Sequence, residues 1–225
     1  MSQYGADKTW PFAEGGGPTI GIATALWGAV LFLWRRRPGT FLGVLAALLS
    51  TFWLLILYFF RDPNRDPLQE PGLVVSPGDG EVVAIVKEHE PHFLRQDLIR
   101  ISIFLSIFDV HVQRVPLGGR VTRVEYRPGK FLQAFRPEAS LENEAITMEL
   151  DTPYGSLLVR QIAGIMARRC VNYLEVGDEV ETGQRFGLIR FGSRVDLFVP
   201  ATAQVLVTIG TQVSGGITPM VRLNE

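Results

Sequence analysis

The sequence contains few of the side chains on which disulfides, metal clusters and lysine-bound cofactors depend. Cys170 is the one cysteine among 225 residues, so an internal disulfide and a cysteine-based metal cluster are excluded. We interpret it as a small buried side chain. Lysine occurs only at positions 8, 87 and 130, and none follows Lys130. The formal net charge of −1 argues against nucleic-acid binding through overall attraction.

Histidine is also scarce, with three in the chain. His89 and His92 belong to a polar segment that contains Pro91. We predict a solvated loop there, because a metal ion needs more ligands than the loop offers. No metal site is predicted. His111 interrupts the apolar residues 103–115, where a neutral buried imidazole needs a hydrogen-bond partner. A structural histidine and a catalytic histidine both fit that position.

Hydrophobic residues are abundant, and their excess lies before residue 61. They make up 47% of the chain, and the mean hydropathy is +0.18. Residues 19–34 and 40–60 form two apolar runs, of which the second is long enough to span a bilayer and the first is borderline. We predict that residues 1–60 form a membrane-anchoring helical hairpin and that residues 61–225 form a separate domain.

The connection between the two apolar runs, residues 35–39, predicts a tight turn with three arginines. If both runs span the membrane, the positive-inside rule places this turn in the cytoplasm and the rest of the chain outside. A shallow hairpin whose arginines snorkel to head groups removes that conflict. A hairpin buried inside a soluble protein is a third interpretation, although nothing downstream is large enough to cover it.

The character of the sequence changes at residues 61–67, a polar linker with two prolines. Short β-like runs separated by turn residues follow it, and helical periodicity is weak apart from a turn near residues 165–170. We therefore predict a mostly β domain. The expected strands are residues 73–75, 80–87, 98–104, 110–115, 119–126, 145–150, 156–163 and 188–190.

Two segments of this domain repeat one pattern. Residues 176–184 and 209–217 each contain an apolar residue and glycine, two polar residues, valine and a further turn with glycine. Such a pair is typical of the barrel-sandwich fold of biotinyl and lipoyl carriers. Those carriers display a lysine on the connecting hairpin, whereas this chain has Phe191, Gly192 and Ser193 there. The pattern favours the carrier fold and disfavours the carrier function.

Several spaced segments together resemble the phosphatidylserine decarboxylases. Residues 76–80 are similar to the family's Ser-Pro-x-Asp-Gly segment, and residues 108–111 to its Asp-x-His run. Residues 191–193 stand where longer members have Leu-Gly-Ser-Thr. A Gly-Ser pair alone carries no information, but the set is specific and covers roughly residues 59–213. Further similar segments are residues 60–63, 128–131 and 142–144.

The resemblance implies an enzyme that cuts itself. In this family a serine becomes a pyruvoyl group, which serves as the electron sink for decarboxylation. Ser193 would attack the carbonyl of Gly192, and elimination followed by loss of ammonia would leave the pyruvoyl at residue 193. The products would be a large subunit, residues 1–192, and a small subunit, residues 193–225. The resemblance places His111 as the base and Asp79 as the carboxylate that orients it.

One departure from the family pattern concerns the base. Longer members carry a second histidine three residues after the first, and this chain has Arg114 there. Either His111 serves both self-cleavage and decarboxylation, or Arg114 contributes charge while another group takes the proton. An inactive family member that never matures is a further alternative.

The resemblance also implies the substrate, phosphatidylserine, which would be converted to phosphatidylethanolamine and CO2. Arginines are candidates for binding its phosphodiester or carboxylate, although each also fits a solvated surface charge. Lys130, Phe131 and Phe135 belong to an apolar loop that fits either lipid contact or core packing. The candidate arginines are Arg114, Arg127, Arg136, Arg168 and Arg169.

The expected partners are phosphatidylserine, membrane lipid and the chain's own two subunits. A homodimer is compatible with the family, and attachment to the cytoplasmic face of the cell membrane is implied by it. The competing hypothesis is a membrane-anchored barrel-sandwich adaptor without catalytic activity. That adaptor would remain an intact chain.

Overall fold

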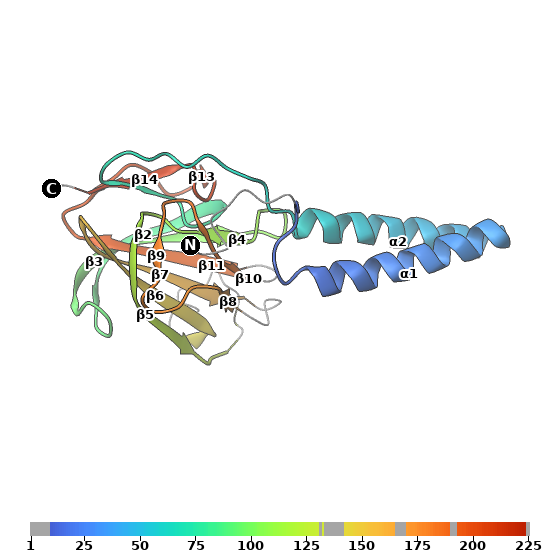
Figure 1. Cartoon of the computed structure of the whole chain (residues 1–225), viewed down its shortest axis with the longest axis horizontal. Coiled ribbons are helices and arrows are strands. Elements are labelled where there is room, and N and C mark those ends of the chain that lie inside the picture. Colours follow the sequence, from blue (N-terminus) through green and yellow to red (C-terminus); the bar gives the residue numbers. More distant parts are fainter. Residues whose placement is uncertain (1–9, 131, 133–141, 165–169, 190–192, 224–225) are drawn as a thin grey trace. The chain divides into compact units, whose positions relative to one another are not determined.

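The structure is a computed structural model that describes residues 10–130, 132, 142–164, 170–189 and 193–223. The chain divides into two compact units, one formed by residues 8–63 and the other beginning at Asn64 and running to the C-terminus. The first unit is helical and the second is mostly β (Figure 1). Each unit is considered by itself below.

The first unit is an antiparallel hairpin of α1 (Gly17–Arg36) and α2 (Thr40–Phe59) (Figure 1). Both helices have 20 residues and are long and apolar enough to cross a membrane. Large apolar side chains on them are exposed, including Ile22, Phe41 and Leu48. The predicted apolar hairpin is confirmed, and this exposure disfavours the alternative of a hairpin buried inside a soluble protein.

Polar side chains join the two helices from within the apolar surface. The indole rings of Trp27 and Trp53 stack with centroids 4.5 Å apart. The Nε1 of Trp27 donates to Ser50 Oγ at 2.8 Å, and the Nε1 of Trp53 donates to Thr24 Oγ1 at 2.9 Å. Each indole N–H therefore has a hydrogen-bond partner on the other helix, and neither is left as an unsatisfied donor on the apolar surface.

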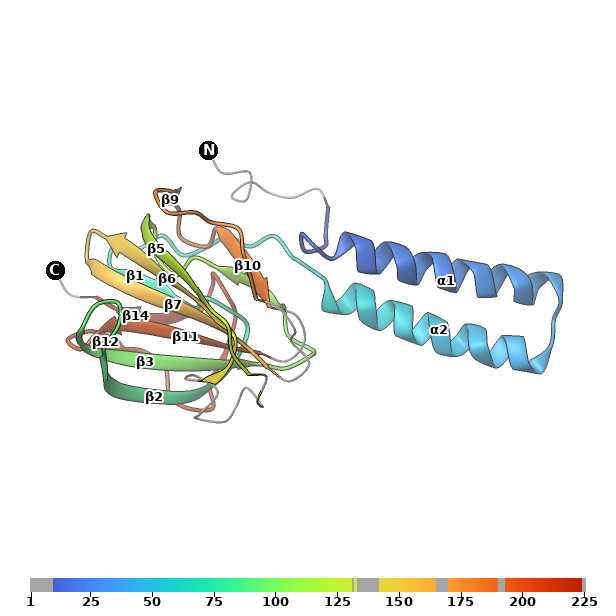
Figure 2. The same ribbon diagram turned by 90° about the horizontal axis from the view of Figure 1, so that it is seen from below.

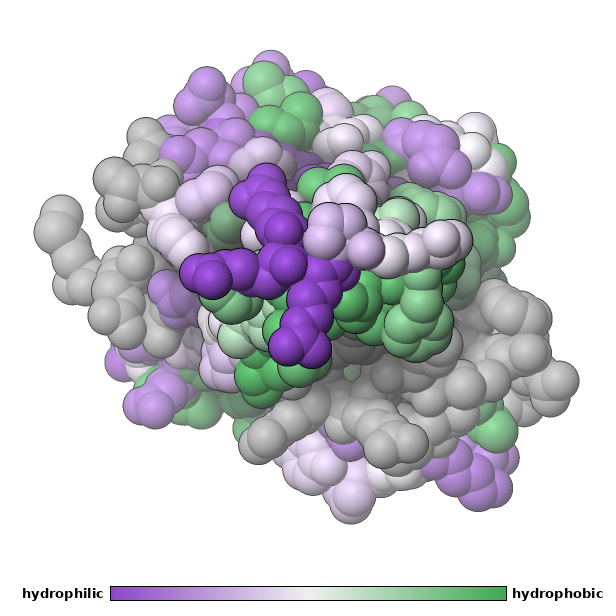
Figure 3. All heavy atoms as spheres, turned by 90° about the vertical axis from the view of Figure 1, so that its right-hand side faces the viewer, coloured by the Kyte–Doolittle hydropathy of each residue, from purple (hydrophilic) through white to green (hydrophobic). Residues whose placement is uncertain are grey.

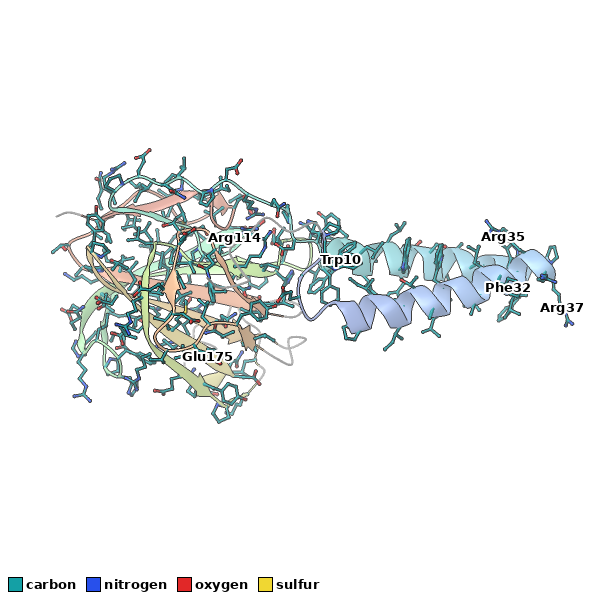
Figure 4. The ribbon with its side chains drawn as sticks, in the orientation of Figure 1. Trp10, Phe32, Arg35, Arg37, Arg114 and Glu175 are labelled. Atoms are coloured by element: carbon teal, nitrogen blue, oxygen red, sulfur yellow. The ribbon has the colours of Figure 1, made fainter. Side chains whose placement is uncertain are left out.

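The arginines at the turn differ from the predicted arrangement. Arg35 and Arg36 belong to the last turn of α1, and only residues 37–39 form the connection. Cations are favoured at the C-terminal end of a helix dipole, which accounts for the extension. Figure 3, which looks onto this end of the hairpin, shows a strongly hydrophilic cluster beside hydrophobic atoms, and Figure 4 labels Arg35 and Arg37 there.

The second unit is built on one antiparallel sheet of eight strands that curls around the main core (Figure 2). Alternate residues face that core, among them Val82, Ile103, Leu150 and Val195, all fully buried. The predicted mostly β, barrel-sandwich-like domain is confirmed. Neighbouring strands run in the order β13 (Gln212–Val213), β2 (Gly80–Glu90), β3 (Gln96–Leu105), β11 (Ser193–Pro200), β7 (Gly155–Ala163), β6 (Ala145–Thr152), β5 (Gly119–Arg127) and β9 (Glu179–Val180).

Two smaller sheets of three strands complete the unit. One has the order β1 (Leu73–Val75), β14 (Pro219–Arg222) and β12 (Gln204–Val205). The other has the order β4 (Val112–Arg114), β10 (Arg185–Ile189) and β8 (Cys170–Asn172). Cys170 is buried, and burial raises the pKa of its thiol, so the thiolate is disfavoured. The prediction of a buried structural cysteine is confirmed.

The repeated segments occupy the two edges of the large sheet. They contribute β9 and β13, and their first glycines, Gly177 and Gly210, have φ of +102° and +88°. Their last glycines also match, with φ of +79° at Gly183 and +77° at Gly216. A Cβ added to Gly216 would lie 3.5 Å from the Cα of Gly183. The two repeats therefore meet, as the barrel-sandwich interpretation requires.

β11, the central strand between β3 and β7, is not among the strands predicted from the sequence. Arg194 and Asp196 interrupt its apolar pattern, yet both are buried and paired with each other at 2.6 Å and 3.0 Å. The expected hairpin at residues 191–193 is also corrected. β10 and β11 belong to different sheets, so the chain passes from one sheet to the other between them.

Candidate active site

Two connections between the same pair of sheets begin and end side by side. β3 ends at Leu105, which pairs with Ser193, the first residue of β11. β4 begins at Val112, which pairs with Leu188 near the end of β10. Residues 106–111 therefore link the same two sheets as residues 190–192, which lie outside the described residues. This corner holds two of the predicted site residues, Ser193 and His111.

Ser193 is held by backbone pairing on both sides, to Leu105 of β3 and Ala163 of β7. Its side chain is fully buried. Side chains two residues apart on a strand share a face, so Ser193 faces inward with Val195. Among the described residues, its Oγ has no hydrogen-bond partner. A buried hydroxyl without a partner is costly, and such groups are often functional.

His111 is fully buried next to the start of β4. Its Nδ1 lies 2.9 Å from the carbonyl oxygen of Asp109. Because a carbonyl oxygen only accepts, Nδ1 carries the proton, and in the neutral ring Nε2 carries the lone pair. The carbonyl of His111 accepts from the N–H of Ile189 at 3.4 Å. The Nδ1 bond therefore sets the tautomer of the neutral ring, and the backbone of His111 is tied to the end of β10.

A closed turn precedes His111. The carboxylate of Asp109 accepts from the backbone N–H of Ser106 at 2.8 Å and from its hydroxyl at 2.7 Å. The N–H of Asp109 in turn donates to the carbonyl of Ser106 at 3.1 Å. These bonds fix the carbonyl that holds His111. They also leave Ile107 and Phe108 exposed at the tip of the turn.

Asp79 lies in the turn that leads into β2. Its carboxylate accepts from both Nη atoms of Arg65, at 2.6 Å and 2.8 Å, and from the N–H of Gly215 at 2.8 Å. His111 is not among its partners. Gly80 follows with φ of +140°, and a Cβ there would collide with the carbonyl of Phe104. The close approach to β3 therefore requires glycine.

Arg114, labelled in Figure 4, lines a polar cavity of about 250 Å³ and lies at the opposite end of β4 from His111. Its N–H donates to the carbonyl of Pro77 at 2.9 Å, and its Nη1 donates to the carbonyl of Gly183 at 3.1 Å. Arg65, which binds Asp79, also lines the cavity, as does the buried Arg185. Arg65 thus links Asp79 to the cavity that Arg114 lines, whereas His111 lies at the other end of β4.

Two predicted segments, which contain Lys130 and Asn143, lie next to each other, and Asn143 bonds to Ala163, the strand-pairing partner of Ser193. Asn143 donates to the carbonyl of Ala163 at 2.7 Å, and Lys130 forms a β-bridge with Asn143. Lys130 itself is exposed and paired with Glu142 at 2.9 Å. Arg127 donates to the carbonyl of Asn143 at 3.3 Å, and burial lowers its pKa. The other predicted residues, Phe131, Phe135, Arg136, Arg168, Arg169 and Gly192, lie outside the described residues.

Comparison with known proteins decides the family. The family model described as Phosphatidylserine decarboxylase matches residues 52–220. The chain belongs to the phosphatidylserine decarboxylase family. The phosphatidylserine decarboxylase proenzyme of Symbiobacterium thermophilum is 44% identical over 214 residues, which cover 95% of this chain and 96% of the relative. That of Carboxydothermus hydrogenoformans is 42% identical over 205 residues, which cover 91% of each chain.

Every segment that resembled the phosphatidylserine decarboxylase family lies within the matched residues 52–220. A third relative, the proenzyme of Gluconacetobacter diazotrophicus, is 46% identical over 191 residues, 83% of this chain and 84% of the relative. All three relatives are named proenzymes, a term for precursors that are processed. The predicted loop is wrong for His89, which lies near the end of β2 and pairs with Asp97 of β3, whereas His92 follows in the turn between these strands. His89 contacts the exposed Asp97 at 3.0 Å, at the opposite end of β3 from Leu105 and the corner.

A buried pair of glutamines next to His111 was not predicted from the sequence. Gln161 of β7 donates to Gln113 of β4 at 2.9 Å, and Gln113 donates to the carbonyl of His111 at 2.7 Å. Both side chains are buried. The available signal was weak: a glutamine next to an arginine in each of the two strands. Arg65 was missed as well, because nothing in a polar linker indicates that one arginine binds Asp79.

Proposed function

We propose that this protein is a membrane-attached phosphatidylserine decarboxylase that matures by cutting itself between Gly192 and Ser193. It would convert phosphatidylserine to phosphatidylethanolamine and CO2. The observation that carries the proposal is Ser193 itself: a fully buried hydroxyl, without a hydrogen-bond partner among the described residues, directly after a glycine. It lies in a chain whose relatives are named phosphatidylserine decarboxylase proenzymes.

Self-cleavage requires a nucleophile and a base. Ser193 Oγ would attack the carbonyl carbon of Gly192, and Nε2 of His111 would take the hydroxyl proton. The Nδ1 bond to Asp109 supports this role, because it keeps the lone pair on Nε2. The C–N bond between Gly192 and residue 193 would then break as the amine nitrogen takes the proton, which leaves an ester. Loss of the Cα proton of residue 193 would expel the carboxylate of Gly192, and hydrolysis of the resulting dehydroalanine would release ammonia. The pyruvoyl group forms from Ser193 in this way.

Asp79 is proposed as a positioning residue of the same site. Its ion pair with Arg65 and its bond from Gly215 hold the turn at residues 76–80. Gly78 of that turn packs close to Leu105, the pairing partner of Ser193. A Cβ added to Gly78 would lie 3.8 Å from the Leu105 side chain. A fixed turn therefore supports the start of β11 from inside the core. This accounts for a carboxylate at residue 79 without direct contact to His111.

The surroundings of residue 193 fit a pyruvoyl group. The position is fully buried, and the backbone on both sides is held by β3 and β7. When present, the group supplies an electron sink for the electrons left by departing CO2. Lysine, which would compete for a reactive carbonyl, is scarce in this chain, and Lys130 is paired with Glu142. His111 is the residue proposed to move protons at the site.

Cleavage would leave the two subunits, residues 1–192 and 193–225, joined. The small subunit supplies β11, whose residues pair with β3 along their whole length and with β7 over six positions. It also supplies β13, at one edge of the large sheet, and β14 and β12 of a three-stranded sheet. These pairings do not depend on the bond before Ser193, so the assembled domain would persist after processing.

Substrate and membrane binding complete the proposal. The hairpin within residues 1–60 would anchor the enzyme at the cytoplasmic face of the membrane. Lys130, Phe131 and Phe135 are proposed lipid contacts, and Arg114 and Arg127 are proposed to attract the anionic head group. The test is release of CO2 from carboxyl-labelled phosphatidylserine in vesicles, with Ser193→Ala beside the natural chain. The adaptor alternative predicts no release from either protein.

A further inference from the structure

A chain of two buried amides runs from His111 to the strand beside Ser193. Gln161 is 1% exposed and Gln113 is 0% exposed. The Nε2 of Gln161 donates to Oε1 of Gln113 at 2.9 Å, and the Nε2 of Gln113 donates to the carbonyl of His111 at 2.7 Å. Amides buried in an apolar core are costly unless their hydrogen bonds are made. One atom of these two amides, Oε1 of Gln161, has no hydrogen-bond partner among the described residues.

The direction of the amide chain is fixed by backbone carbonyls. The Nε2 of Gln161 also donates to the carbonyl of Val171 at 3.1 Å. Carbonyls only accept, so the atoms facing Val171 and His111 must be the amide nitrogens. A flipped amide would place two acceptors together. Oε1 of Gln161 is therefore the atom directed away from Gln113 and Val171.

Gly187 makes room for this arrangement. A Cβ at residue 187 would lie 2.6 Å from Nε2 of Gln161 and would collide with the carbonyl of Val171. Gly187 pairs with Gln113 on one side and with Asn172 on the other. The glycine in the middle of β10 thus lets the side chain of Gln161 reach across to the smaller sheet.

The strand register places Gln161 close to Ser193. Ser193 pairs with Ala163, and Val195 pairs with Gln161. Residues two apart on a strand share a face, so Gln161 and Ser193 are diagonal neighbours on the inner face. Such neighbours lie about 7 Å apart, within reach of a long side chain. The side chain next to Ser193 on this face therefore carries a buried acceptor that has no donor within the described part of the chain.

We propose that Oε1 of Gln161 accepts a hydrogen bond from the primary ammonium or amine of the head group when it binds at residue 193. The inference rests on the proposed function. A neutral carbonyl suits this donor, because it binds the N–H without adding a charge that would raise the pKa of the amine. Gln161 would then favour head groups with an N–H over those without one.

Binding of soluble short-chain lipids to the processed protein tests this role. Calorimetric titration would compare dihexanoyl phosphatidylethanolamine, which has the amine, with dihexanoyl phosphatidylglycerol, which lacks it. Gln161→Met keeps the length of the side chain and removes the acceptor. We expect its Kd for the ethanolamine lipid to rise by about 10- to 100-fold, the usual effect of losing a hydrogen bond to a charged group. The Kd for the glycerol lipid should stay unchanged.

A second variant separates this role from packing. Gln161→Glu, as a neutral acid, keeps one donor and one acceptor and should retain the preference for the ethanolamine lipid. Equal weakening of both lipids in Gln161→Met, or no weakening of either, would overturn the proposal. So would a Gln161→Met chain that stays whole while Gln161→Glu is processed, because that result assigns Gln161 to maturation. If the natural chain itself stays whole, the proposed function has failed instead.

Discussion

Arg65 and Asp79 form a bidentate ion pair, with Nη1–Oδ1 at 2.6 Å and Nη2–Oδ2 at 2.8 Å, although they are 14 residues apart. Their side chains are only 11% and 12% exposed. Arg65 also donates to the carbonyl of Gly215 at 2.6 Å, which joins residues near both ends of the domain. The pair thus fastens the linker after the helical unit to the turn that supports β11.

Removing one partner of this pair should destabilise the β domain. Arg65→Met leaves the carboxylate of Asp79 buried without its cation, and we expect a loss of about 3 kcal/mol in the free energy of unfolding. Arg65→Met combined with Asp79→Leu should recover most of that loss, because both charges are gone. Thermal unfolding of the three proteins measures this. Equal stability of Arg65→Met and the natural chain would show that the pair contributes nothing.

His111→Asn should fold but process slowly. The amide Nδ2 can replace Nδ1 as donor to the carbonyl of Asp109, whereas no basic nitrogen replaces Nε2. Loss of a general base usually slows a reaction by about 100- to 10,000-fold. The fraction of cut chain, followed over time by gel electrophoresis, gives the rate. Processing at the natural rate would remove His111 from the maturation step.

Gly187→Ala should disturb the glutamine pair. The added methyl would collide with the carbonyl of Val171 and press against Nε2 of Gln161. Since backbone on β8 must move, we expect a loss of about 1–3 kcal/mol in stability. Gly21→Ala is the matched control, because nothing lies within 4 Å of a Cβ at that helical position. Similar melting temperatures for both variants would contradict the packing described for Gly187.

The buried carboxyl of Asp196 should make the stability of the β domain depend on pH in the acid range. Burial alone would raise the pKa of this fully buried carboxyl, but Arg194, with Arg100 and Ser102, outweighs burial and lowers it below the ordinary 3.8. A folded pKa below the unfolded one means that the stabilisation is complete above about pH 4 and is lost as the pH falls through the folded pKa.

Asp196→Asn should therefore flatten the acid limb of the stability curve. Denaturant unfolding measured at several pH values between about 5 and 2 gives the slope. Asp97→Asn serves as the control, since that side chain is 65% exposed and its loss should leave the slope unchanged. A slope in Asp196→Asn equal to that of the natural chain would show that this carboxyl does not govern acid stability.

The sequence allowed prediction of features that repeat or alternate locally. The first strand, Leu73–Val75, and the start of β5 at Gly119 were placed correctly, because their apolar residues are bounded by turn residues. The paired glycines of the two repeats were predicted as equivalent, and they share positive φ. Both patterns, the apolar runs between turn residues and the repeated glycines, are visible within a few consecutive residues of the sequence.

Features that depend on distant pairing were not predictable. β11 was missed because Arg194 and Asp196 interrupt its apolar pattern, and their burial depends on each other and on Arg100 of β3. The bond between Gln161 and Gln113 depends on the register of strands from two sheets. The position of Asp79 likewise depends on Arg65. Each is a polar pair whose second member gives no local signal.

The most direct test of the account is the intact mass of the purified protein, measured together with that of Ser193→Ala. We predict two chains from the natural protein, with a small chain that begins at residue 193 and carries the mass of a pyruvoyl-blocked N-terminus. Ser193→Ala should give one uncut chain. A natural protein that remains whole, or a small chain that begins with a free serine, would contradict the account.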